Sequence, residues 1–402
     1  MRPLRWKFCL QAIACLLFSG AGGVPPLLAQ DLQWGGSLRG YQFVRTEENP
    51  LEKRRDTELW ILRLTLETAF NPRIKTESHG VLTLQSPPRT GASRLATSPA
   101  RTYLSLERDL IDRSGVSLQG SFDRLNIQGH YDSVRIVLGR QAISWGVTNF
   151  WPSMDLFSPF APQQVDRDYK AGVDAVRVTI PLGAYSELEL IGAVLGSSLS
   201  RDGAAGALAR INLGPVDLGL MGGTFHGDTV AGGFFTANVM GTGLRGELTW
   251  TRSGDPEDLQ RDRKTFSRGS LAFDRQLTRD LSLTVESSWN GYGADDASEY
   301  IQFIEADRIL RGEVNALGQW FAGISVVWQL HPLWTFTNVL LVNWQDPSSL
   351  WVPSLQWSTS DNSEVLFGAQ VGLGRELQAG GIPRSEYGSV PNTVYAAFKA
   401  YF

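Results

Sequence analysis

Charged side chains recur at alternate positions in several stretches, with apolar residues at the positions between them. On such polar faces lie Arg63, Glu67, Arg135, Arg177, Arg210, Arg245, Glu247 and Glu286, joined by Glu187 and Glu189. Charges of this kind act on the charge of a solute that passes beside them. Separate basic and acidic walls would favour charged solutes, whereas interleaved pairs would brace the structure, and the sequence leaves both arrangements open.

Residue types that carry out catalysis are scarce. The four histidines are His79, His130, His226 and His331, and none belongs to a recognisable catalytic constellation. Nucleophile elbows, paired metal ligands and phosphate-binding loops are absent from the sequence as well. Asp166, Asp168 and Asp174 are spaced like calcium ligands but lack an EF-type frame, so solvated loop charges are expected. The sequence predicts no enzyme activity, no cofactor and no bound metal.

The segments that carry these charges are predicted to be β-strands. Residues 281–290, LSLTVESSWN, alternate apolar and polar side chains, and residues 60–67, 244–251 and 364–371 do the same. No apolar run after residue 30 is long enough for a membrane-spanning helix. Alternating segments of about ten residues predict a transmembrane antiparallel up-and-down β-barrel, with its apolar face towards lipid and its polar face towards a watery lumen. A soluble β-sandwich is the alternative.

The number of strands conflicts with the rule that bacterial barrels have an even count. From residue 173 onward, short turns and long polar loops alternate regularly and define 13 strands. The first part of the chain adds six, and the total of 19 is odd. One segment between Pro87 and Gly139 is therefore misassigned, either residues 101–109 or residues 115–131. We expect 18 strands, with 16 as the next choice, in a single domain over residues 30–402.

A long aromatic and proline-rich loop is predicted at residues 146–170. Its aromatic side chains need apolar surroundings, which the barrel mouth offers, and its prolines suit a segment without a ladder partner. One possibility is an inward loop that narrows a channel, and the other is an external lid. The candidates for constriction are Trp145, Phe150, Trp151, Asp155, Phe157 and Phe160.

The same region carries a family resemblance. Residues 122–125 read FDRL, and three further stretches follow, LGRQAISWG at 138–146, NFWPSMDLFSPFAP at 149–162 and DYKAGVDAVR at 168–177. This order resembles a group of largely uncharacterised porin-like outer-membrane barrels, some of them related to alginate-export proteins. The resemblance covers roughly residues 122–180 and implies the fold. It says little about the substrate, because one barrel architecture hosts many functions.

Both ends of the chain indicate export to an outer membrane. Residues 1–29 match a secretory signal peptide, with Arg2, Arg5 and Lys7 before an apolar core, and they contain both cysteines. The last residues, NTVYAAFKAYF, alternate up to the terminal Phe402. A terminal aromatic on such a strand resembles the signal read by the barrel-assembly machinery. Without residues 1–29 the chain has 34 basic and 41 acidic residues, so a nucleic-acid partner is not expected.

These features favour an outer-membrane channel of the porin kind for passive or substrate-preferring diffusion of small polar solutes. Its expected partners are membrane lipid and the solute, and the oligomeric state is open. Two alternatives remain. An export or uptake barrel for polymeric or hydrophobic material would need an apolar path or a continuous basic track. A closed structural or adhesive barrel would have a filled lumen.

Overall fold

The computed structural model describes residues 31–46, 56–87, 102–113, 115–254, 264–378 and 381–402. The predicted signal peptide, residues 1–29, lies outside the described residues. Among these residues, no helix combines the length and the apolar character needed to cross a membrane.

Nineteen β-strands form one sheet. In the first half of the chain they are β1 (Asp31–Arg45), β2 (Asp56–Asn71), β3 (Ile74–Ser86), β4 (Glu107–Arg113), β5 (Val116–Tyr131), β6 (Val134–Gln141), β7 (Val173–Pro181), β8 (Glu187–Val194), β9 (Gly203–Asn212) and β10 (Val216–Phe225). In the second half they are β11 (Asp228–Val239), β12 (Thr242–Arg252), β13 (Thr265–Gln276), β14 (Leu281–Asn290), β15 (Trp320–His331), β16 (Trp334–Asn343), β17 (Ser348–Ser360), β18 (Ser363–Leu373) and β19 (Thr393–Tyr401).

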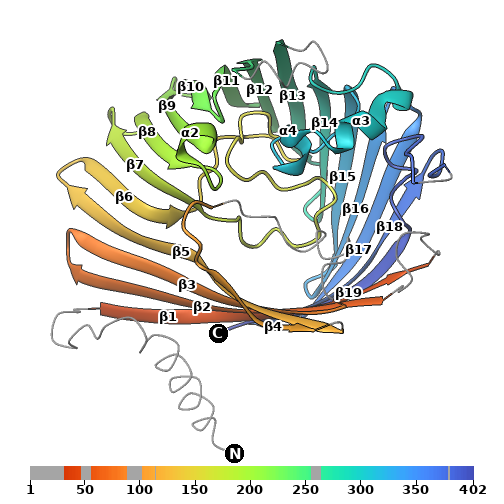
Figure 1. The fold of residues 1–402 in the computed structure, drawn as a ribbon, viewed down its shortest axis with the longest axis horizontal. Helices are drawn as coiled ribbons and strands as arrows, with labels where there is room; N and C mark the ends of the chain where they lie inside the picture. Colours follow the sequence, from red (N-terminus) through yellow and green to blue (C-terminus); the bar gives the residue numbers. More distant parts are fainter. Residues whose placement is uncertain (1–30, 47–55, 88–101, 114, 255–263, 379–380) are drawn as a thin grey trace, which may run out of the picture.

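The sheet closes on itself into a ring of strands around a central space, as Figure 1 shows. The last strand, β19, pairs antiparallel with β1 from Ser37↔Tyr401 to Arg45↔Thr393, and β1 pairs on its other edge with β2. The pairing of β19 with β1 joins the first and last strands, so the sheet has no free end strand, which is what a sheet immersed in lipid requires.

The odd strand count has a simple geometric cause. One edge of β5 pairs with β3 along almost its whole length. The other edge pairs first with β4, at residues 116–121, and then with β6, at residues 125–131. Because β4 and β6 use successive parts of the same edge, they share one position, and the barrel has 18 strands as predicted. The surplus strand, β4, overlaps the first of the two segments that we expected to be misassigned, residues 101–109.

The two faces of the wall differ as the alternation predicts. In β19, Val394 and Phe398 are exposed on the outer face, whereas Tyr395 and Lys399 are buried on the inner face. Tryptophans on the outer surface lie near strand ends, among them Trp34, Trp250, Trp320, Trp328 and Trp357. An amphipathic ring at such a position suits the boundary between lipid and water.

Connections alternate between short turns at one end of the barrel and longer loops at the other. One connection at the end with the longer loops is short: a two-residue turn joins β10 to β11, where His226 and Gly227 both have positive φ, the geometry that matches the twist of a tight hairpin. The connection between β14 and β15 at the same end, residues 291–319, which we call the external loop, carries η3 (Ala297–Glu299), α3 (Tyr300–Ile304) and α4 (Asp307–Leu310). A shorter helix, α2 (Leu199–Asp202), lies between β8 and β9. The predicted asymmetry of turn lengths is confirmed.

Candidate functional site

The segment between β6 and β7, residues 142–172, lies inside the ring of strands (Figure 1). We call it the inward loop. It extends beyond the predicted residues 146–170 by a few positions at its start and by two at its end. It has no ladder partner, so its backbone polar groups must find other partners.

Glu286 of β14 provides partners at the tip of the inward loop. Its carboxylate accepts hydrogen bonds from the backbone N–H groups of Asn149 (2.8 Å), Phe150 (3.1 Å) and Trp151 (2.9 Å). The Glu286 side chain is completely buried. Successive amides that converge on an anion form a nest, and hydrogen bonds to an ionised acceptor are stronger than neutral ones. The tip is thereby fixed to the far side of the barrel from β6 and β7 (Figure 1).

Two residues of β12 hold the loop on either side of that tip. The Glu247 carboxylate accepts from the N–H of Val147 at 2.7 Å and from the N–H of Met154 at 3.2 Å. Arg245 donates to the carbonyl oxygen of Val147 at 2.8 Å and forms an ion pair with Asp274. Both predicted wall residues therefore bind main-chain groups of the inward loop.

The second half of the loop is attached where the barrel closes. Asp166 forms a buried ion pair with Arg39 of β1. Asp168 accepts from the Lys399 ammonium at 2.9 Å and from the Tyr401 hydroxyl at 2.6 Å, both on β19. These aspartates have cationic partners in the wall, which accounts for their charge without a metal ion. Within the described ranges, no three His, Cys, Asp or Glu side chains lie close enough together to hold a metal ion.

The predicted constriction residues differ in their surroundings. Trp145 is 1% exposed, donates from Nε1 to Glu189 at 2.5 Å and meets the ring of Phe157 edge to face. Phe150 and Trp151 pack in a separate apolar cluster on the other side of the lumen. Asp155 is bound within the loop by Lys170 and by the Ser144 hydroxyl. Phe160 is half-buried.

The remaining predicted wall charges are mostly paired. Arg210 contacts Glu187 at 2.6 Å, and Arg63 contacts Asp123 at 2.6 Å. Arg177 is half-buried on the inner face, and its Nε lacks a hydrogen-bond partner in the described part of the chain. Two further candidates are exposed, Glu67 beside a cavity near the β2–β3 turn and Arg135 opposite Thr179. The charges that the structure brings together form pairs around the wall.

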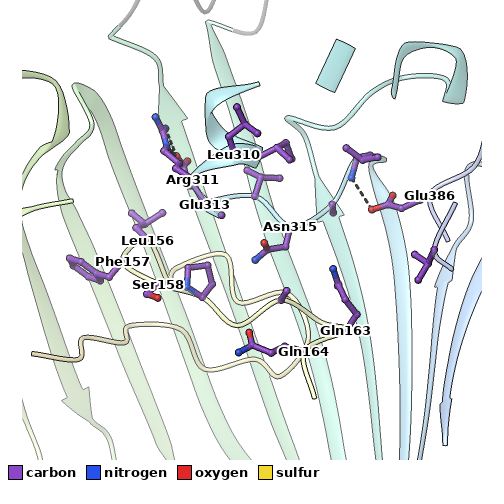
Figure 2. Close-up of a pocket in the computed structure, with 18 of the residues that line it drawn as sticks. Leu156, Phe157, Ser158, Gln163, Gln164, Leu310, Arg311, Glu313, Asn315 and Glu386 are labelled. Atoms are coloured by element: carbon purple, nitrogen blue, oxygen red, sulfur yellow. Dashed lines mark hydrogen bonds and ion pairs between the residues drawn. The ribbon is translucent and has the colours of Figure 1, made fainter. Parts of the chain in front are cut away.

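Two cavities adjoin the inward loop. The outer cavity, about 530 Å³, lies between the loop, residues 309–317 and residues 386–391 (Figure 2). The inner cavity, about 420 Å³, lies between residues 164–172 of the loop and the wall of β1, β2, β3 and β5. Gln164 and Gly172 line both cavities, so the two spaces lie next to each other across these residues.

Charged pairs surround the inner cavity. The ring of Tyr169 lies between two guanidinium groups, with its centroid 4.9 Å from Cζ of Arg39 and 4.0 Å from Cζ of Arg63. These arginines are paired with Asp166 and Asp123 respectively. Cations stacked on an aromatic face gain electrostatic stabilisation, more so where they are desolvated. Opposite charges are therefore held close together beside the inner cavity.

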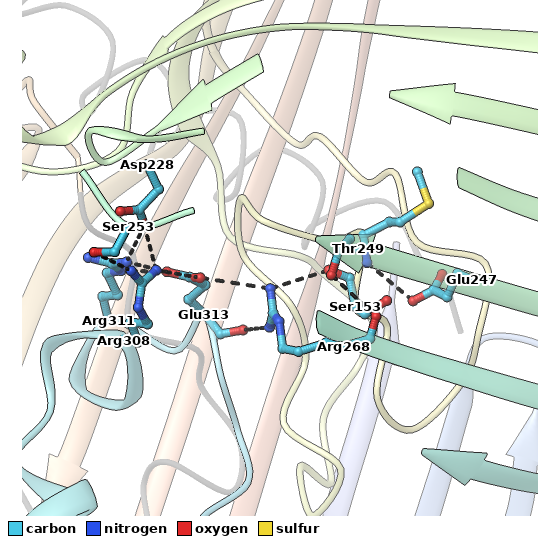
Figure 3. Close-up of polar contacts among 10 residues, drawn as sticks. Ser153, Asp228, Glu247, Thr249, Ser253, Arg268, Arg308, Arg311 and Glu313 are labelled. Carbon is cyan, nitrogen blue, oxygen red and sulfur yellow. Dashed lines mark hydrogen bonds and ion pairs between the residues drawn. The ribbon is translucent and has the colours of Figure 1, made fainter. Parts of the chain in front are cut away.

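A network of polar side chains connects the external loop to the barrel wall (Figure 3). Arg308 of α4, 1% exposed, contacts Asp228 of β11 at 2.5 Å and Glu313 at 3.1 Å. Arg268 of β13 donates to the carbonyl oxygen of Glu313 at 2.8 Å and reaches the carbonyl of Ser153 in the inward loop. Burial alone would raise the pKa of Glu313, but the surrounding guanidinium groups hold it well below its usual range.

Several contributors were not predicted from the sequence. Arg39, Asp123 and Tyr169 line the inner cavity, and Lys399 anchors the loop beside it. Asp123 and Tyr169 fall in the stretches that carry the family resemblance, but none of the four was assigned a role in the site. Lys399 was placed on the polar face of the last strand, and that alternation is the one signal that pointed inward. The partners of these residues come from distant positions, which single-sequence patterns do not report.

The chain folds into a large closed β-barrel with an anchored inward loop. Solved structures share the barrel fold. No protein-family model matches the chain, and no curated protein matches it. Acinetobacter baumannii OccAB4 has a TM-score of 0.54 and 8% identity, over 94% of this chain and 99% of that chain.

Two Pseudomonas aeruginosa proteins are similar in the same way. OpdK, in a structure with vanillate, has a TM-score of 0.56 and 10% identity, over 93% of this chain and 99% of that chain. The outer membrane protein OprD has a TM-score of 0.54 and 10% identity, over 93% of this chain and 94% of that chain. At these identities the likeness establishes the fold.

Proposed function

We propose that this protein is an outer-membrane channel through which small polar solutes diffuse past the inward loop. The observation that carries the proposal is the pair of cavities, outer and inner, that lie on either side of the inward loop and share Gln164 and Gly172 in their linings. The route runs along the β1 to β5 side of the barrel, because the tip of the loop is fixed to β12 and β14. The loop narrows the lumen without filling it.

The surroundings of the barrel support the same function. Its outer face carries exposed aliphatic and aromatic side chains that suit contact with lipid. The fold is shared with the outer membrane protein OprD of Pseudomonas aeruginosa. Signal-peptide removal at residue 29, recognition of the last strand by the barrel-assembly machinery and the absence of enzyme activity belong to this proposal. So does the relation to alginate-export barrels, which the residues at 122–180 suggest.

Electrical recording in a planar bilayer tests the channel. The purified protein without residues 1–29 is expected to give stable conductance steps, and a protein that inserts but stays silent would contradict the proposal. The route is tested with Gln164→Cys, since both natural cysteines lie in residues 1–29. A charged thiol reagent should lower the conductance of this variant. It should leave Leu138→Cys, 53% exposed on the outer face, unchanged.

A further inference from the structure

The outer cavity offers a binding surface that has no role yet in the path described above. Its floor is formed by residues 156–164 of the inward loop, and its walls by the external loop and residues 386–391 (Figure 2). A volume of about 530 Å³ lies within the range of small-molecule sites. A solute that enters the proposed channel reaches this space first.

Every charged side chain in the lining is already engaged. Arg311 donates from Nε to Glu313 at 2.8 Å, and its guanidinium is 3.7 Å from Asp228. Glu386 accepts from the N–H groups of Leu317 and Gly318 and from the Asn343 side chain. The fourth charged candidate, His226, lies 3.6 Å from Asp202. An ionic ligand would have to break one of these contacts, at a cost in desolvation.

Uncharged polar groups remain free. Figure 2 places the side-chain amides of Gln163 and Asn315 in the cavity, with the Ser158 hydroxyl near the floor. In the part of the chain that the structure describes, none of these three side chains has a hydrogen-bond partner. An amide both donates and accepts, and a hydroxyl does so too. The set therefore matches a ligand with several hydroxyl groups.

Apolar side chains complete the lining. Phe157 is fixed edge-on between Trp145 and Phe225, at centroid distances of 5.0 and 5.7 Å. Leu310 and Val314 of the external loop and Val390 line the same cavity. Apolar walls combined with a few orienting polar groups are typical of small-molecule sites. They suit a molecule that has an apolar face as well as hydroxyl groups.

We propose that the outer cavity is a binding subsite for an uncharged polyhydroxylated solute with an apolar face, the class to which small neutral oligosaccharides belong. The subsite rests on the proposed channel function, because it lies at the entrance of the path. Ser158, Gln163 and Asn315 orient the hydroxyl groups, and Phe157 and its apolar neighbours cover the C–H face. The closed ion pairs exclude charged analogues.

The test uses maltotriose as the neutral probe and trigalacturonate as a charged probe of similar size. Maltotriose is expected to reduce the channel current in a saturable way, and trigalacturonate is expected to bind at least tenfold more weakly. Gln163→Leu and Asn315→Leu should each weaken maltotriose binding about threefold to tenfold, the loss typical of a neutral hydrogen bond. The matched control, Gln302→Leu, changes an exposed amide of α3 outside the lining and should have no effect.

The outcomes separate this subsite from the channel. An open channel that maltotriose does not affect, or that trigalacturonate blocks equally well, would overturn the subsite and leave the channel standing. If the protein conducts no current, calorimetry in detergent with the same probes and variants still measures binding. Absence of maltotriose binding there would overturn the subsite, and binding weakened only by the lining variants would support it.

Discussion

Gly323 of β15 lies directly beneath the ring of Phe150, and a Cβ atom at position 323 would come within 2.5 Å of that ring. The glycine provides the space into which the tip of the inward loop packs. A strand glycine often marks a place where another group approaches closely.

Gly323→Ala should displace the tip of the inward loop, because an added methyl group in a packed contact costs about 1 to 3 kcal/mol. We expect faster proteolysis within residues 142–172 and a larger or noisier conductance. Phe150→Ala in the same chain should relieve the clash. The control is Gly192→Ala on β8, where a Cβ would meet nothing within 4 Å. Equal behaviour of the two single variants would contradict the packing role.

Glu286→Gln should loosen the same tip. Replacement removes the charge from a buried carboxylate that accepts from three backbone amides, and each hydrogen bond to a charged group contributes about 1.5 to 3 kcal/mol. Hydrogen exchange of the amides of residues 149–151 should accelerate, with increased conductance noise. Glu67→Gln, at an exposed position, serves as the control. Unchanged exchange in Glu286→Gln would show that the nest does not hold the loop.

Deletion of residues 149–162 should raise the single-channel conductance, since this segment crosses the lumen and fills space beside the β12 to β14 wall. Circular dichroism would confirm that the barrel still forms. A folded deletion variant with the conductance of the intact protein would remove the segment from its assigned role.

Arg177→Glu should shift the ion selectivity of the channel towards cations, because it reverses a charge on the inner face. The reversal potential under a salt gradient measures this shift. Arg279→Glu makes the same charge change in the β13–β14 turn, away from the path, and should have a much smaller effect. An unaltered reversal potential in Arg177→Glu would place Arg177 outside the route.

Contact between the external loop and the β18–β19 connection, residues 374–392, should depend on pH through Glu386. Burial, reinforced by Asp346, raises the pKa of this carboxyl from 4.5 to about 7, against the lowering effect of the Leu317 and Gly318 amides. An acid with a raised pKa in the attached state is destabilised when it ionises. Attachment is therefore strongest below pH 4.5 and weakens as the pH rises to about 7.

Hydrogen exchange at residues 317–318, corrected for the intrinsic rate, should show greater protection at pH 5 than at pH 8. Glu386→Gln removes the titrating group and should make the protection independent of pH. Identical protection of the unaltered protein at both pH values would argue against this behaviour.

Local alternation was sufficient to predict the barrel, since lipid and lumen impose a period of two on every strand. It failed where β4 and β6 share an edge of β5, because two short strands that occupy one position have the same local pattern as two strands with a position each. Glu247 and Glu286, predicted from alternation as candidates to line the pore, hold the main chain of the inward loop. Their partners were not predictable, because backbone amides are present at every position and leave no signature in a sequence.

The mode of attachment also bears on how such a barrel diversifies. Glu247 and Glu286 grip the peptide backbone of the inward loop, and every amino acid except proline supplies the same N–H group. Side chains along the tip can therefore be exchanged without loss of these hydrogen bonds. The sequence of the loop can change while its attachment to the barrel wall is kept. This property suits both evolutionary change of specificity and deliberate re-engineering of the pore.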